Sequence, residues 1–196
     1  MKSALATAAV LAAIAAAAVP SQAAAPTPQV VDPKGDALDT QAAHDVVSVL
    51  FTQTKKAGVP TGFTVAMTLA GPQTTTPGVN YVISGQTANC GLFSINWAPA
   101  GPVIARDQVS MECGAPSEVD GSPYTIINVA PVAKGNTLTW SFKRKMFPKE
   151  LQKGDTFTDL AVNVQQNEPV TSIIGPSVFT DLADYDVASS TASFRW

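Results

Sequence analysis

A short acidic segment near the N-terminus holds the residues best suited to chemistry in this chain. Four carboxylates share fourteen positions with a proline and a glycine, residue types that let a chain turn back on itself. Hard cations such as calcium are bound by carboxylate and backbone carbonyl oxygens presented from such turns. We therefore expect a calcium site at the start of the first long strand, with these ligands: Asp32, Asp36, Asp39 and Asp45.

The acidic residues also have an ordinary explanation, which the sequence leaves open. Asp side chains often accept hydrogen bonds from backbone N–H groups and so stabilise turns without an ion. A second acidic segment, from Asp181 to Asp186, is interpreted as a solvated loop around Tyr185, the aromatic ring that we most expect to be exposed. The alternative is that Asp181, Asp184 and Asp186 form a second ion site, or complete the first if the chain ends meet in the fold.

Residues for catalysis are sparse. His44 is the only histidine and no Gly-x-Ser-x-Gly sequence occurs, so a serine nucleophile would depend on His44 and Asp45 acting on a distant serine. A glycosidase needs two carboxylates facing each other across a cleft, and nothing in the sequence pairs two of the 15 acidic residues in this way. The sequence favours a protein that is not an enzyme, with a secreted hydrolase of unrecognised type as the alternative.

The first 23 residues have the features of a secretion signal. Lys2 precedes an alanine-rich apolar stretch, and Ser21-Gln22-Ala23 offers small residues for cleavage. The apolar stretch is shorter than the roughly 20 residues that span a bilayer. We predict a signal peptide over residues 1–23 and a single secreted, extracellular domain over residues 24–196. The formal net charge of −3 gives no general attraction for nucleic acid or anionic lipid.

The two cysteines, Cys90 and Cys113, are predicted to form a disulfide, because exported chains mature in oxidising compartments. Their spacing matches no compact metal-binding motif. Closing a loop of this length stabilises a fold by roughly 3.4 kcal/mol on the chain-entropy estimate.

Alternation of apolar and polar residues predicts strands, and 15 prolines and 13 glycines punctuate them. Phe63 to Leu69 and Leu138 to Phe142 show the alternation most clearly, and Tyr81, Trp97 and Trp140 are expected in the core. One helical turn is expected at Pro148 to Leu151. The pattern predicts an all-β, single antiparallel sandwich of jelly-roll type with about nine strands: Val46–Thr54, Gly62–Ala70, Val79–Ser84, Phe93–Trp97, Gln108–Cys113, Tyr124–Val129, Leu138–Phe142, Phe157–Gln166 and Thr191–Trp196.

A basic run, Lys143-Arg144-Lys145, lies between two expected hairpin turns, Lys134-Gly135-Asn136 and Lys153-Gly154-Asp155. Charges on an exposed or edge strand discourage pairing between molecules, which is the interpretation we favour. Recognition of an acidic cell-envelope polymer is the alternative.

Two parts of the chain carry a resemblance. One is the Asp-Pro-x-Gly-Asp opening before an Asp that begins a strand, followed by the apolar strand at Phe63 to Leu69. The other is Leu138 to Phe142, followed by Phe147 to Leu151 and Lys153 to Phe157. Together they resemble the extracellular β-sandwiches grouped around family 9 carbohydrate-binding modules, DOMON-like domains and the C-terminal domain of glucodextranase-type enzymes.

This resemblance implies a jelly-roll-like sandwich with calcium near its N-terminal segment, acting as a sugar-binding or envelope-associated accessory module. Asp32, Asp36 and Asp45 match the acidic pattern, and Asp39 is included by proximity. The chain departs from the family in having no accompanying catalytic domain and no matching pair of sugar-gripping aromatic rings. The predicted function is a secreted, non-catalytic binding module for a glycan or cell-envelope polymer, with a protein-interaction module as a further alternative.

Overall fold

The computed structural model describes residues 26–76, 78–99, 107–113, 124–152, 155–167 and 182–195. Several predicted features fall outside these residues: the signal peptide, Asp181, and most of the expected turn at Lys153-Gly154-Asp155. The side chains of Asp184 and Tyr185 are likewise outside the description.

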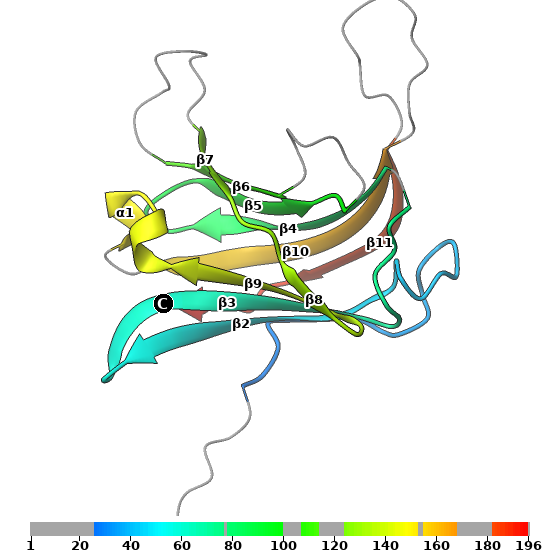
Figure 1. Cartoon of the computed structure of the whole chain (residues 1–196), viewed down its shortest axis with the longest axis horizontal. Coiled ribbons are helices and arrows are strands. Elements are labelled where there is room, and N and C mark those ends of the chain that lie inside the picture. The colour runs from blue at the N-terminus through cyan, green and yellow to red at the C-terminus, as the bar shows by residue number, and fades with distance from the viewer. Residues whose placement is uncertain are drawn as a thin grey trace, which may run out of the picture.

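The chain forms two antiparallel sheets packed face to face, which confirms the predicted all-β sandwich (Figure 1). The described residues form twelve strands rather than about nine. One sheet has the order β1 (Val30–Val31), β2 (Val46–Lys56), β3 (Val59–Leu69), β9 (Thr137–Lys143) and β8 (Val132–Lys134). The other has the order β11 (Leu182–Ser190), β10 (Thr156–Asn167), β4 (Val79–Thr87), β5 (Leu92–Trp97), β6 (Asp107–Glu112) and β7 (Tyr124–Asn128), with β12 (Phe194–Arg195) pairing β10.

The predicted apolar faces are the core faces. Val65 pairs with Trp140 in the β3–β9 register, and neither side chain is exposed. Tyr81 is also fully buried, whereas Trp97 is only partly buried and packs against the Tyr81 ring at 5.4 Å between centroids. Alternation along these strands therefore identified the buried face correctly, since successive side chains of a strand point to opposite sides of its sheet.

Three strands were not predicted, and one of them corrects an interpretation. The segment from Asp181 to Asp186 was expected to be a loop, but Leu182–Ser190 is β11 and pairs with β10 along eight residues. The edge of β10 offers backbone partners that override the low strand propensity of aspartate. The other two, β1 and β8, have two and three residues and are too short to show a period.

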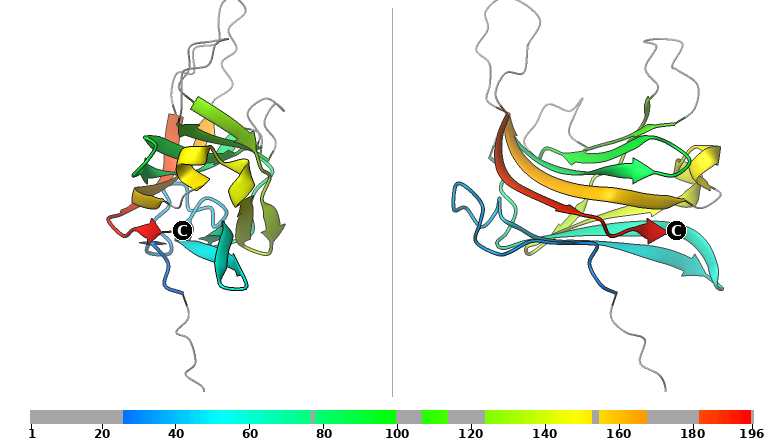
Figure 2. Two further views of the ribbon diagram at one scale, coloured as in Figure 1. Left: turned by 90° about the vertical axis from the view of Figure 1, so that its left-hand side faces the viewer. Right: turned by 180° about the vertical axis from the view of Figure 1, so that it is seen from behind.

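One end of the sandwich is filled by phenylalanine rings. The Phe63 ring lies 4.9 Å from that of Phe142, 5.3 Å from Phe147 and 5.4 Å from Phe157, between centroids. A 3-10 turn, η1 (Arg144–Met146), and the expected helical turn, α1 (Lys149–Gln152), bring Phe147 onto this cluster. Figure 2 shows α1 at this end and the N-terminal turn (blue to cyan) at the opposite end.

Cys90 and Cys113 form the predicted disulfide, with Cα atoms 4.8 Å apart. The β8–β9 hairpin turns at Gly135 and Asn136 as expected, since Lys134 pairs with Thr137 and Gly135 adopts φ +61°. Among the described residues, no helix is long and apolar enough to cross a membrane.

Candidate metal centre

Three carboxylates meet where the edges of the two sheets come together. Asp32 follows β1, Asp36 lies in the turn after it, and Asp186 belongs to β11. One oxygen from each residue lies within 4.8 Å of the other two. We call these three residues the Asp trio.

The turn that carries Asp32 and Asp36 is held in place by its own backbone. Asp32 donates its N–H to the carbonyl of Val47 at 3.0 Å, and Gly35 donates its N–H to Asp45 Oδ2 at 2.6 Å. Gly35 has φ +96°, a conformation that residues with a side chain rarely adopt. The chain therefore folds back at Gly35 and returns Asp36 toward Asp32.

Asp186 connects the two sheets. Its Oδ2 accepts the backbone N–H of Val46, the first residue of β2, at 2.5 Å. The side chain is only 7% exposed, and Asp186 pairs with Val164 in the β10–β11 register. A carboxylate on an edge strand of one sheet thus forms a hydrogen bond to the first residue of β2 in the other sheet.

Burial and like charge make the Asp trio costly without a counterion. Burial, followed by the charge and the hydrogen bond of Asp186, raises the pKa of Asp32 from 3.8 to about 7. Burial also raises the pKa of Asp186, although the Val46 N–H opposes this shift. Asp36 and Asp45 add negative charge to both groups. The cluster therefore holds a proton or a cation more readily than isolated carboxylates do.

The geometry and the donor set fit a hard cation. Calcium binds oxygens at about 2.4 Å, so two oxygens on one ion lie at most about 4.8 Å apart, and the oxygens of the Asp trio lie within that limit. Asp32 Oδ2 and Asp45 Oδ1 are buried without a hydrogen-bond partner among the described residues. Asp45 is 4% exposed and adds its charge to the trio. A cation shared by these carboxylates would satisfy oxygens that the protein leaves unpaired.

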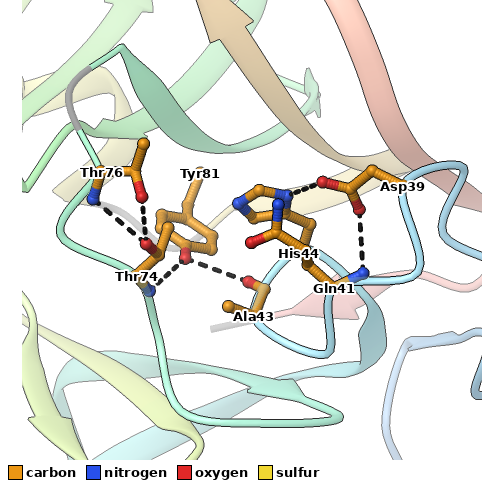
Figure 3. A network of polar contacts seen from close by, with 7 residues as sticks. All are labelled: Asp39, Gln41, Ala43, His44, Thr74, Thr76 and Tyr81. Carbon is orange, nitrogen blue, oxygen red and sulfur yellow. Dashed lines mark hydrogen bonds and ion pairs between the residues drawn. The ribbon is translucent and has the colours of Figure 1, made fainter.

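Asp39 takes a different place from the one expected of it. Its Oδ2 lies 2.5 Å from His44 Nδ1, and its Oδ1 accepts the Gln41 N–H at 3.1 Å (Figure 3). His44 is 2% exposed and forms an ion pair with Asp39 when protonated. Both oxygens of Asp39 therefore contact groups within its own turn.

Tyr81 anchors the same turn to the rest of the sandwich. Its hydroxyl donates to the carbonyl of Ala43 and accepts the N–H of Thr74, both at 3.0 Å (Figure 3). Burial raises the pKa of Tyr81 to about 12, so the hydroxyl keeps its proton over the whole neutral range. The segment around His44 is thereby fixed between Asp39 and Tyr81.

The structure brings Asp32 and Asp36 together and places Asp45 beside them, whereas Asp39 faces His44. Asp181, Asp184 and Asp186 were together expected to complete the site if the chain ends meet; Asp186 does join it, whereas Asp181 and the side chain of Asp184 lie outside the described residues. No protein-family model, curated protein or solved structure matches this chain. The function of the chain must therefore be inferred from its sites.

Proposed function

We propose that this protein is an exported, non-catalytic binding module for an extracellular glycan or cell-envelope polymer, stabilised by one calcium ion in the Asp trio. The observation that carries the calcium site is the convergence of three carboxylates within 4.8 Å beside the buried Asp45. The ion neutralises charges that burial makes unfavourable, and it ties the N-terminal turn to β11.

The Cys90–Cys113 disulfide supports export, because such bonds persist in oxidising compartments. The position of His44 supports a role without catalysis. The imidazole is 2% exposed and contacts Asp39, so a substrate in solvent has little access to it. The resemblance to carbohydrate-binding sandwiches supplies the class of ligand.

Thermal unfolding with and without calcium tests the ion site. Calcium at about 100 times its dissociation constant adds roughly 2.7 kcal/mol to the free energy of unfolding. For a domain of this size that corresponds to a rise in Tm of about 5–10 °C. Asp36→Asn should abolish the rise, because the exposed side chain loses a ligand charge without disturbing the core.

Glu150→Gln is the matched control, because it removes one exposed carboxylate from α1, far from the Asp trio. This variant should keep the full calcium response. Equal melting temperatures in calcium and in chelator, with metal analysis showing the chelated sample to be metal-free, would contradict the ion site. The Asp residues would then serve only to form the turn.

A further inference from the structure

A basic groove lies on the outer side of the β2–β3–β9 sheet, at the end that carries the phenylalanine cluster. It has a volume of about 820 Å³. Four cationic side chains line it, one from the end of β2 and three from the end of β9 and η1: Lys56, Lys143, Arg144 and Lys145.

These cations have no acidic partners in the described part of the chain. The one ion pair found there joins His44 to Asp39, in the segment before β2. The chain as a whole is acidic, with a formal net charge of −3. Four positive charges that have no acidic partner among the described residues surround one groove of an acidic protein, and they therefore indicate a negatively charged partner.

The register of the strands explains the shape and chemistry of the groove. Thr54, Gly62 and Lys143 lie in one row across β2, β3 and β9, and the neighbouring row ends with Thr64 and Ser141. Gly62, at the centre of the first row, is buried. A Cβ there would approach the Phe142 carbonyl oxygen to 1.9 Å, so only glycine fits.

Hydroxyl groups form the second chemical feature of the groove. The hydroxyls of Thr64 and Ser141 form no hydrogen bond to the described residues, and Ser141 is exposed. Hydroxyls can donate to and accept from the hydroxyls of a sugar. The aromatic residues that line the groove, Phe63 and Phe142, are 0% and 2% exposed and offer no ring for stacking against a nucleic-acid base.

We propose that this groove binds a segment of a polyanionic glycan. Carboxylate or sulfate groups on the sugar chain contact Lys143, Arg144 and Lys145, and sugar hydroxyls contact Thr64 and Ser141. Arg144 suits this role because guanidinium binds such oxyanions in a bidentate manner. The inference rests on the proposed binding function and assigns it a location and a charge class.

Titration calorimetry with defined polymers tests the groove. Hyaluronate supplies carboxylates and dextran sulfate supplies sulfates, so the two arms distinguish the anionic group, and unmodified dextran is the uncharged reference. The double variant Lys143→Gln and Lys145→Gln should weaken binding of the preferred anionic polymer at least tenfold at low salt. The wild-type affinity should also fall as salt rises, because the charges are exposed.

The matched control removes two exposed lysines elsewhere, Lys34→Gln and Lys134→Gln, for the same change in net charge. Its affinity should stay within twofold of wild type. An equal loss of affinity in both double variants would contradict binding in the groove, since net charge alone would then govern the affinity. Ser141→Ala should lower the affinity for the glycan without changing its salt dependence. An unchanged affinity would mean that the Ser141 hydroxyl does not contact the glycan.

Two other polyanions complete the test. Tighter binding to a single-stranded DNA oligomer, or to vesicles containing phosphatidylglycerol, than to both anionic glycans would overturn the choice of a glycan. A mixed panel of neutral and anionic glycans separates this inference from the proposed function. If the double variant Lys143→Gln and Lys145→Gln binds the panel as well as wild type does, the groove is not the binding site, but the proposed function stands. If the wild-type protein binds no glycan of the panel, the proposed function itself is contradicted.

Discussion

The two ends of the sandwich carry opposite charges and hold them in opposite ways. At one end the carboxylates stand on short side chains, and two of them, Asp45 and Asp186, are buried and accept the backbone N–H groups of Gly35 and Val46. At the other end the cations stand on long side chains, three of them exposed: Lys56, Lys143 and Lys145.

This difference separates two kinds of charged site. Buried like charges raise the free energy of the fold unless a counterion of fixed stoichiometry neutralises them. Exposed cations remain hydrated and cost the fold little, so each contributes weakly and only a multivalent partner gains from several. The acidic end therefore suits an ion that is part of the structure, and the basic end suits a polymer that comes and goes.

The largest expected effect tests whether packing, rather than charge, stabilises the basic end. Phe142→Ala should cost about 3–5 kcal/mol, because it leaves a cavity among the phenylalanine rings. Ser141→Ala, on the outer face of the same strand, should cost far less. Chemical denaturation of both variants measures the difference, and equal losses would mean that the strand register is wrong.

The next effect concerns the hydrogen bond from Val46 N–H to Asp186, which joins the two sheets at the acidic end. Asp186→Ala leaves the buried N–H of Val46 without an acceptor, which costs about 1–3 kcal/mol. Asp186→Asn keeps an acceptor oxygen and should retain most of that stability. Both variants should lose the calcium response. If the Asp186→Ala and Asp186→Asn variants unfold at the same denaturant concentration in chelator, the hydrogen bond to Val46 does not stabilise the fold.

A smaller effect is the pH dependence of the calcium-free protein. Asp32 binds a proton more tightly in the folded state, with a pKa of about 7, than in the unfolded chain, where it is 3.8. The folded state therefore holds a proton that the unfolded chain has released between these values, and stability falls as pH rises from about 4 to about 7.

Asp32→Asn removes this titration and should flatten the profile, while the amide can still donate to Asp186. Urea denaturation in chelator across this pH range measures both proteins. A wild-type profile that rises with pH over the same interval would contradict the burial of like charge at the acidic end.

The smallest effect belongs to the cations of the basic groove. Lys143→Gln and Lys145→Gln together should change the free energy of unfolding by less than about 0.5 kcal/mol, because exposed charges contribute little. Thermal unfolding in low salt without any polymer measures this. A marked destabilisation would show that these lysines stabilise the fold, and the two ends would then not differ in the way described.

The parts of the fold that local pattern determines could be predicted. Phe63 to Leu69 and Leu138 to Phe142 alternate strictly because one side faces the core, and the hairpin at Gly135 depends on local turn chemistry. By contrast, β11 could not be predicted. Its aspartates are typical of loops, and what makes it a strand is its pairing with the edge of β10, which no local sequence pattern reveals.

In the candidate site, too, local sequence predicts the position of some residues and not of others. Asp32 and Asp36 share a turn, so their proximity followed from Pro33 and Gly35. Asp39 is equally near in sequence, but the structure directs it to His44, five residues away. Sequence distance cannot distinguish these outcomes, because the direction of each side chain in a turn depends on the backbone dihedral angles of that residue. The basic run was interpreted as edge protection because the groove forms only when β2, β3 and β9 pair, which the run itself does not show.

The bond from Asp186 to Val46 joins residues 140 positions apart. During synthesis, the N-terminal turn therefore emerges long before the chain contains the carboxylate that completes it. Contacts of such long range close late in folding because of their loop entropy. Calcium would then act as a marker of completion: it binds only after the last long strand has joined the sandwich, and a chain that ends before Leu182 would retain its acidic turn but gain no stability from the ion.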